Sequence, residues 1–164
     1  MEVKFEVKMT PKIMYNFNVN HTYRSLGGIL GVVFGLVSFV MFFATLGEVS
    51  QSFSILYLLF GVWFVLYLPA NLYVRSGSQV KNNPAFKKPI TYVVSDSGIC
   101  IMQDSQKAEC KWDSILKVCK TGKSILVYSG RRNAFIFPKE AIGEQYDALV
   151  KVIRKNMPTK KVKL

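Results

Sequence analysis

The stretch that decides the fold is LGGILGVVFGLVSFVMFFATL, residues 26–46, and it is followed closely by FSILYLLFGVWFVLYLPANL, residues 53–72. Neither contains an acidic, basic or histidine side chain. A helix of about 20 apolar residues crosses the hydrocarbon core of a bilayer, so each stretch is long enough to span one. A buried helix of a soluble protein is rarely uncharged over such a length, and a cleaved signal peptide has a shorter apolar region. The sequence therefore predicts a two-helix transmembrane hairpin over residues 25–74.

The composition agrees with a membrane protein. Half of the 164 residues are hydrophobic, only 20% are charged, and the net charge is +12. Soluble domains usually carry about 25% charged residues, and here the two apolar stretches carry none. This pattern excludes an ordinary soluble globule and a disordered chain.

The charges around the hairpin predict its orientation. The link Gly47–Ser52 has Glu48 as its only charge, whereas basic residues flank the hairpin on both sides. Lys and Arg close to membrane helices favour the cytoplasmic side. We therefore expect both termini in the cytoplasm and Glu48 outside.

Three glycines on the first apolar stretch predict close helix packing. Gly27, Gly31 and Gly35 recur every four residues and leave a flat strip that another helix backbone can approach. The partner is either the second helix of the same chain or, alternatively, the same strip of a second copy in a homodimer. No Asp, Glu, Lys, Arg or His lies inside either stretch, which argues against a transporter or channel formed by one chain.

The residues outside the hairpin predict one cytoplasmic domain. Residues 2–9 alternate polar and apolar side chains, the pattern of a half-buried strand, and residues 1–24 are interpreted as this strand with a lead-in helix. Residues 75–89 are rich in turn formers and predict a connector. Residues 90–157 predict a β-domain with a C-terminal helix, and residues 158–164 a basic, disordered tail.

Short segments separated by turn residues predict an antiparallel meander after Pro89. The predicted strands are Ile90–Ser95, Ile99–Gln103, Ala108–Trp112, Ile115–Lys120, Ser124–Ser129 and Asn133–Phe137. An amphipathic helix follows over about Lys139–Asn156. The lone N-terminal strand needs partners, so we expect it to pair with the later sheet. The predicted fold class is an α+β membrane protein: a transmembrane helical hairpin plus an antiparallel β-barrel or sandwich, like that of pleckstrin-homology (PH) domains, capped by the C-terminal amphipathic helix.

Two short segments carry a resemblance to a known family: WDSILKV at residues 112–118 and FIFPKE at residues 135–140. Together with the hairpin and the strand before it, they resemble the bacterial YcxB-like family. The resemblance implies a two-span protein of the bacterial cytoplasmic membrane with a PH-like C-terminal domain. Trp112, Ile115 and Pro138 are the core residues of the two segments. The resemblance implies no catalytic residue.

The sequence shows no pattern of catalytic or metal-binding residues. Gly122-Lys123-Ser124 lacks the preceding glycine of a phosphate-binding loop and predicts a hairpin turn. His21 is the only histidine, and no nucleophile or metal-ligand pattern accompanies it. Cys100, Cys110 and Cys119 have no paired spacing and are expected to be reduced, buried thiols. We expect a protein that is not an enzyme and has no cofactor or metal.

The basic excess predicts a membrane-facing surface. Each basic residue near an anionic cytoplasmic leaflet contributes about 1 kcal/mol of attraction. The residues expected to face the anionic lipids of the inner leaflet are Lys87, Lys88, Lys123, Arg131 and Arg132. Nucleic acid is not expected as a partner, because the sequence has neither a helix-turn-helix pattern nor a repeated aromatic platform.

These features predict a membrane-anchored protein whose cytoplasmic domain binds lipid or a protein partner that the sequence does not specify. A specific version is self-protection against a membrane-active peptide. The alternatives are an accessory subunit of a membrane enzyme and an oligomeric transporter made of several hairpins.

Overall fold

The structure is a computed structural model that describes residues 2–130 and 133–164. It is an α+β chain that divides into two compact units. One unit, the β unit, combines Met1–Ile13 with Val80–Leu164, and the other, the helical unit, is the continuous segment Met14–Gln79. The predicted α+β class is confirmed, and the helical unit is an insertion within the sequence of the β unit.

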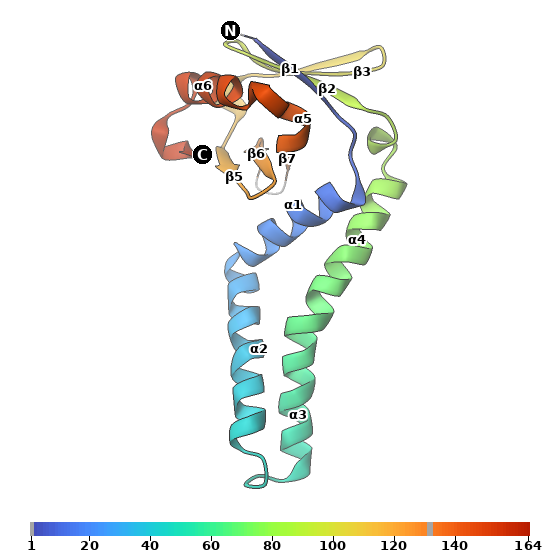
Figure 1. The fold of residues 1–164 in the computed structure, drawn as a ribbon, viewed down its shortest axis with the longest axis vertical. Coiled ribbons are helices and arrows are strands. Elements are labelled where there is room, and N and C mark those ends of the chain that lie inside the picture. Colours follow the sequence, from blue (N-terminus) through green and yellow to red (C-terminus); the bar gives the residue numbers. More distant parts are fainter. Residues whose placement is uncertain (1, 131–132) are drawn as a thin grey trace. The chain divides into compact units, whose positions relative to one another are not determined.

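The helical unit is built on two long helices that run antiparallel side by side (Figure 1). The helices are α1 (Pro11–Tyr23), α2 (Leu26–Ala44), α3 (Gln51–Val62), the π-helix η1 (Trp63–Tyr67) and α4 (Leu68–Asn82). Ser25 caps α2, because its Oγ accepts a hydrogen bond from the Gly28 amide at 3.1 Å. Helices α3, η1 and α4 form one continuous helix. The wide turn η1 ends two residues before Pro69, whose ring and missing N–H disturb the preceding turn of a helix.

The outer faces of these helices are apolar and exposed. Among the described residues, every exposed large hydrophobic side chain except Leu116 lies between Leu26 and Val74. Leu26–Ala44 and Gln51–Asn82 are long and apolar enough to cross a membrane. The core helix of a soluble protein would be mostly buried, which neither of these helices is within this chain.

The first sheet contains the N-terminal strand. It has the antiparallel order β1-β2-β3-β4, and its strands are β1 (Val3–Val7), β2 (Ile90–Ser95), β3 (Gly98–Gln103) and β4 (Gln106–Cys110). In β1, Val3, Phe5 and Val7 are buried and the residues between them are exposed, as the alternating sequence predicts. Phe5 lies opposite Tyr92, so the expected pairing of the N-terminal strand with the later sheet is present.

The second sheet has the order β7-β6-β5-β8. Its strands are β5 (Lys117–Lys120), β6 (Ser124–Tyr128), β7 (Ala134–Pro138) and β8 (Val162–Lys163). The first three are antiparallel, and β8 adds to β5 in parallel, with Val118 opposite Val162. The prediction of a disordered tail was therefore wrong at residues 162–163. These two residues gain backbone partners because the outer edge of β5 is otherwise open.

Aromatic side chains from both sheets meet in the core of the β unit. The Phe137 ring lies 5.0 Å from that of Phe5 and 4.9 Å from that of Tyr92, centroid to centroid, in edge-to-face geometry. Burial raises the pKa of the Tyr92 hydroxyl to about 12. The two sheets therefore enclose one core.

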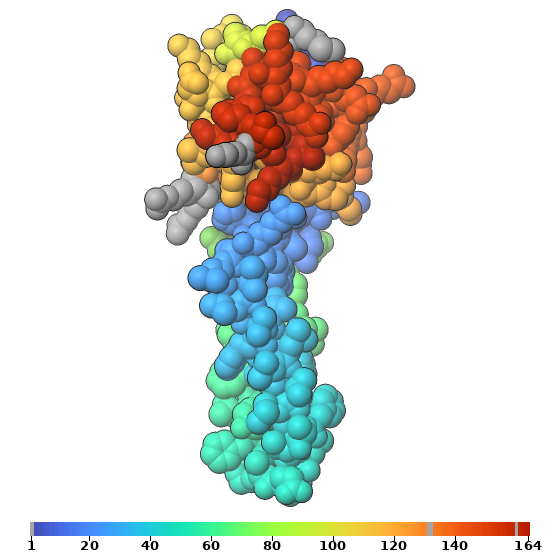
Figure 2. Space-filling model, turned by 90° about the vertical axis from the view of Figure 1, so that its left-hand side faces the viewer, coloured from blue at the N-terminus to red at the C-terminus, as the bar shows by residue number. Residues whose placement is uncertain are grey.

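Helices close this core. Helix α5 (Lys139–Ile142) contacts β1 and β7, one strand from each sheet, and α6 (Tyr146–Asn156) contacts β2. The single helix predicted over about 139–156 is interrupted at Gly143, whose φ of +56° is a left-handed conformation that suits glycine. Leu149 and Ile153 of α6 are fully buried. Figure 2 shows α6 and the C-terminal residues, in red, over one face of the β unit.

Short 3-10 helices occupy most of the remaining connections: η2 (Pro84–Phe86), η3 (Trp112–Ser114), η4 (Gly143–Gln145) and η5 (Thr159–Lys161).

Two predicted boundaries differ from the structure. The connector predicted over residues 75–89 is helical as far as Asn82, because Ser76 and Gln79 accept hydrogen bonds from Asn18 and hold α4 against α1. The strand predicted over 115–120 begins at Lys117, since η3 occupies the preceding turn.

Candidate functional site

The glycine strip of α2 packs against the second apolar helix of the same chain. A Cβ added at Gly31 would lie 3.2 Å from Cδ1 of Phe64. At Gly35 it would lie 2.8 Å from Cβ of Phe64 and 3.1 Å from Cγ2 of Val65, which leaves no room for a side chain. Two of the three predicted glycines therefore lie in a seam within the hairpin.

Two further glycines of the helical unit, Gly28 and Gly61, also make close contacts, and neither was singled out from the sequence. A Cβ at Gly61 of α3 would meet the ring of Phe39 at 2.9 Å, so each long helix presents a phenylalanine to a glycine of the other. Gly28 lies under the carbonyl of Thr22, where the chain turns from α1 into α2, and a Cβ there would overlap that oxygen. The signal was available for Gly61, because a lone glycine inside an apolar helix often marks a close approach.

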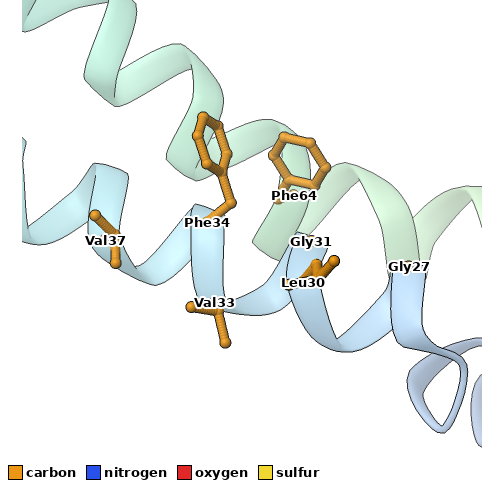
Figure 3. Close-up of a pocket in the computed structure, with 7 residues that line it drawn as sticks. All are labelled: Gly27, Leu30, Gly31, Val33, Phe34, Val37 and Phe64. Atoms are coloured by element: carbon orange, nitrogen blue, oxygen red, sulfur yellow. The ribbon is translucent and has the colours of Figure 1, made fainter.

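Gly27 lies in an open apolar groove beside the seam. The groove has a volume of about 470 Å³ and is lined by Gly27, Leu30, Gly31, Val33, Phe34, Val37 and Phe64 (Figure 3). Nothing lies within 4 Å of a Cβ built at Gly27. The rings of Phe34 and Phe64 meet edge to face, 5.4 Å apart, across the two helices. An apolar groove of this kind can receive a lipid chain or another helix but contains no chemical group for catalysis.

A polar cluster joins α1 to α4 in the helical unit. The amide nitrogen of Asn18 donates hydrogen bonds of 2.8 Å to Ser76 Oγ and to Gln79 Oε1. Ser76, which is fully buried, donates in turn to the Leu72 carbonyl at 2.6 Å. The Tyr15 ring of α1 and the Tyr73 ring of α4 also meet edge to face, with their centroids 5.6 Å apart. The buried Ser76 hydroxyl therefore has both a hydrogen-bond donor, Asn18, and an acceptor, the Leu72 carbonyl.

The basic residues predicted to face lipid have different surroundings. Lys87, Lys88 and Lys123 are all exposed. Lys88 Nζ lies 2.7 Å from Asp104 Oδ2, so a carboxylate already compensates its charge. Arg131 and Arg132 lie outside the described residues. Lys123 lies beside Lys139, a basic residue that the sequence did not single out. The Lys139 amide donates a hydrogen bond of 2.9 Å to the Lys123 carbonyl.

The core residues of the two family segments are buried or half-buried in the β unit. Ile115 is 1% exposed, Pro138 is buried at the end of β7, and Trp112 is half-buried in η3. The Trp112 indole N–H donates a hydrogen bond of 3.0 Å to the carbonyl of Ser95. That bond fixes η3 to the end of β2 and satisfies the indole, as expected for a packing residue.

The remaining titratable groups form no reactive set. Cys119 is buried, whereas Cys100 and Cys110 are only half-buried, so the expectation of three buried thiols was wrong for two of them. Burial raises the pKa of the Cys110 thiol, which makes it less reactive. The hydrogen bond from Lys155 lowers the pKa of Asp96 to about 2 and joins the β2–β3 turn to α6. Within residues 2–130 and 133–164, no three His, Cys, Asp or Glu side chains are placed to hold a metal ion.

Comparison with known proteins gives a family match. Residues 94–153 match the family model described as YcxB-like protein. This segment runs from β2 to α6 and includes Trp112, Ile115 and Pro138, so the resemblance expected from the sequence is confirmed there. The two apolar helices lie outside the matched residues. No curated protein and no solved structure is significantly similar to the chain.

Proposed function

Starting from the match of residues 94–153 to the YcxB-like family, we propose that this chain is a bacterial inner-membrane protein that presents a cytoplasmic PH-like domain to a protein or lipid partner. In this proposal α2 and the helix α3–η1–α4 span the membrane as a hairpin. The protein is not an enzyme, and its function is to hold a binding domain at the membrane.

The single observation that carries the proposal is the pairing of β1 with β2 across the hairpin sequence. Val3 lies opposite Val94 and Val7 opposite Ile90, although the two strands are separated in sequence by both apolar helices. A chain whose two flanks share one sheet must have both flanks on the same side of the membrane. The basic residues on both flanks, compared with Glu48 alone in the link, then favour the cytoplasm as that side.

The exposed apolar surface supports the membrane location. Side chains such as Leu26, Phe43 and Leu59 are 60–74% exposed. In water such a surface would be far larger than the apolar patches that soluble monomers carry, whereas in lipid it needs no cover. The helix Gln51–Asn82 has 32 residues. It is longer than the roughly 20 residues that a bilayer core needs, so its α4 end projects beyond the membrane.

Two antiparallel layers and a terminal amphipathic helix support a PH-like assignment for the β unit. Sheets β1–β4 and β5–β7 enclose one core, and α5 contacts both of them. Binding proteins of many kinds use such scaffolds.

A membrane-held module of this size also suits self-protection against a membrane-active peptide. The test of this version is whether deletion of the gene changes the sensitivity of the cells across a panel of such peptides.

Crosslinking in native membranes tests the binding role. A tagged full-length chain is crosslinked in the cells that express it, and the products are identified by mass spectrometry. We expect residues of the β unit to crosslink reproducibly to one partner protein or to lipid. Crosslinks confined to copies of the chain itself would contradict the binding role and favour an oligomer of hairpins.

A further inference from the structure

Three lysines gather at the β5–β6 turn. Lys120 ends β5, Lys123 lies in the turn, and Lys139 begins α5. The Nζ atoms of Lys120 and Lys139 each lie 5.8 Å from the centroid of the Tyr146 ring. Two cations from different elements therefore share one aromatic ring, with the third on the turn beside them. We call these three residues the lysine turn.

Lys139 connects the lysine turn to the backbone. Its Nζ donates a hydrogen bond of 2.8 Å to the Gly122 carbonyl, and its amide donates one of 2.9 Å to the Lys123 carbonyl. An ammonium group has three donors, so Lys139 keeps donors for a ligand. Its head group is held in place before any ligand arrives.

The turn also offers backbone donors. Thr121 and Ser124 satisfy each other: the Thr121 amide and hydroxyl donate to the Ser124 carbonyl, and the Ser124 amide donates to Thr121 Oγ1. Between them, the amides of Gly122 and Lys123 have no hydrogen-bond acceptor among residues 2–130 and 133–164. Successive free amides in a turn form a concave site for anions.

The positive charge of this cluster is uncompensated in the described part of the chain. The ion pairs of the structure use other lysines, Lys88, Lys107 and Lys155. Acidic residues on the neighbouring helices, Glu140 and Asp147, are exposed and form no ion pair with the lysine turn within the described ranges. Like charges held together without a counterion repel one another, and an anion would relieve this repulsion.

We propose that the lysine turn, with the free amides of Gly122 and Lys123, binds the phosphate group of an anionic ligand. Phosphate oxygens accept several hydrogen bonds at once from ammonium and amide donors. The inference deepens the proposed function, on which it rests, by giving the ligand chemistry of the cytoplasmic domain. The phosphate belongs either to an anionic lipid headgroup or to a soluble phosphate compound.

The test uses the full chain in phosphatidylcholine nanodiscs, with ¹³C- and ¹⁵N-labelled lysine incorporated during expression, so that every ammonium group keeps its charge and its three donors. In one arm inorganic phosphate is added, with chloride at matched ionic strength as the reference. In the other arm phosphatidic acid replaces part of the lipid and no phosphate is added. We expect the NMR signals of Lys120, Lys123 and Lys139 to shift together in at least one arm, while those of Lys8 and Lys111 stay unchanged.

The responding arm identifies the source of the phosphate, and silence of the lysine turn in both arms overturns the proposal. Because copurification with nanodiscs reports membrane insertion independently, a failure of phosphate binding is distinguishable from a failure of the membrane anchor. Lys123→Gln should weaken binding about tenfold, since it removes a charge-assisted bond, and Lys123→Arg should largely restore it. Lys111→Gln removes the same charge from an exposed site elsewhere. An equal loss from Lys111→Gln and Lys123→Gln would show diffuse attraction and contradict a defined site.

Discussion

Gly35→Ala and Gly27→Ala are the same substitution in the same helix and should have different effects on stability. At Gly27 the added methyl group enters open space, because nothing lies within 4 Å. At Gly35 it would lie 2.8 Å from Cβ of Phe64, an atom that cannot move unless the helix itself moves. The two long helices must therefore separate to accommodate Gly35→Ala, whereas Gly27→Ala requires no movement within the chain.

The size of the difference follows from two opposing effects. Alanine is up to about 1 kcal/mol more favourable than glycine in a helix interior, which is the largest change expected at position 27. Overpacking a close contact costs about 1–3 kcal/mol. Gly35→Ala should therefore reduce the free energy of unfolding by up to about 2 kcal/mol after the propensity gain, and Gly27→Ala should leave it unchanged or raise it.

Unfolding of the full chain by increasing SDS in mild detergent micelles, followed by loss of helicity, measures both variants. We expect a lower midpoint for Gly35→Ala and an equal or higher midpoint for Gly27→Ala. The mass of the detergent-solubilised protein is measured in parallel. A Gly27→Ala variant that is as unstable as Gly35→Ala, with a smaller assembly mass, would refute this reasoning and show that the glycine strip joins two copies.

Three further predictions concern the β unit. Phe5→Ala should lower the stability of the full chain by about 3–5 kcal/mol, because Phe5 is 5% exposed and packs on Phe137; urea unfolding followed by near-UV circular dichroism measures it, and a loss below about 1 kcal/mol would mean that β1 is dispensable. The hydrogen bond from Lys155 lowers the folded-state pKa of Asp96 from 3.8 to about 2, so its stabilising effect is present above pH 4 and is lost as the pH falls towards 2. The unfolding midpoints of Asp96→Asn and the wild type should therefore differ at pH 6 and converge near pH 2. A difference that stays constant with pH would contradict this linkage. Trp112→Phe removes the donor of a 3.0 Å hydrogen bond to a backbone carbonyl and should cost about 1–3 kcal/mol; an unchanged urea midpoint would show that water replaces the indole.

The sequence predicted the elements that depend on periodicity. The alternation of residues 2–9 predicted β1 and its buried face, and β2, β3, β6 and β7 follow the predicted segments closely. The apolar stretches predicted α2 and the second long helix, because an uncharged run of this length has few other stable conformations. In β1 the local alternation also gives the buried face, whereas every residue of β6 is buried.

The sequence failed where distant contacts decide the structure. The backbone bonds of β8 come from β5, far away in the chain, and nothing in residues 158–164 indicates a strand. Lys120 and Lys139 of the lysine turn were missed for the same reason, whereas Lys123 was predicted. Lys139 reaches the turn through Gly122, and it shares Tyr146 with Lys120 only once α5 has packed on the second sheet. Charge counting along the chain instead favoured Lys88, which the fold pairs with Asp104.

Cysteine labelling of spheroplasts tests most directly that the hairpin crosses the membrane with both flanks on one side. Glu48→Cys adds a thiol to the link between the helices, and the half-buried Cys100 and Cys110 are natural reporters in the β unit. With a membrane-impermeant maleimide, the account predicts that intact spheroplasts react only at position 48 and that the natural cysteines react only after permeabilisation. Labelling of Cys100 or Cys110 in intact spheroplasts, or protection of position 48, would contradict it.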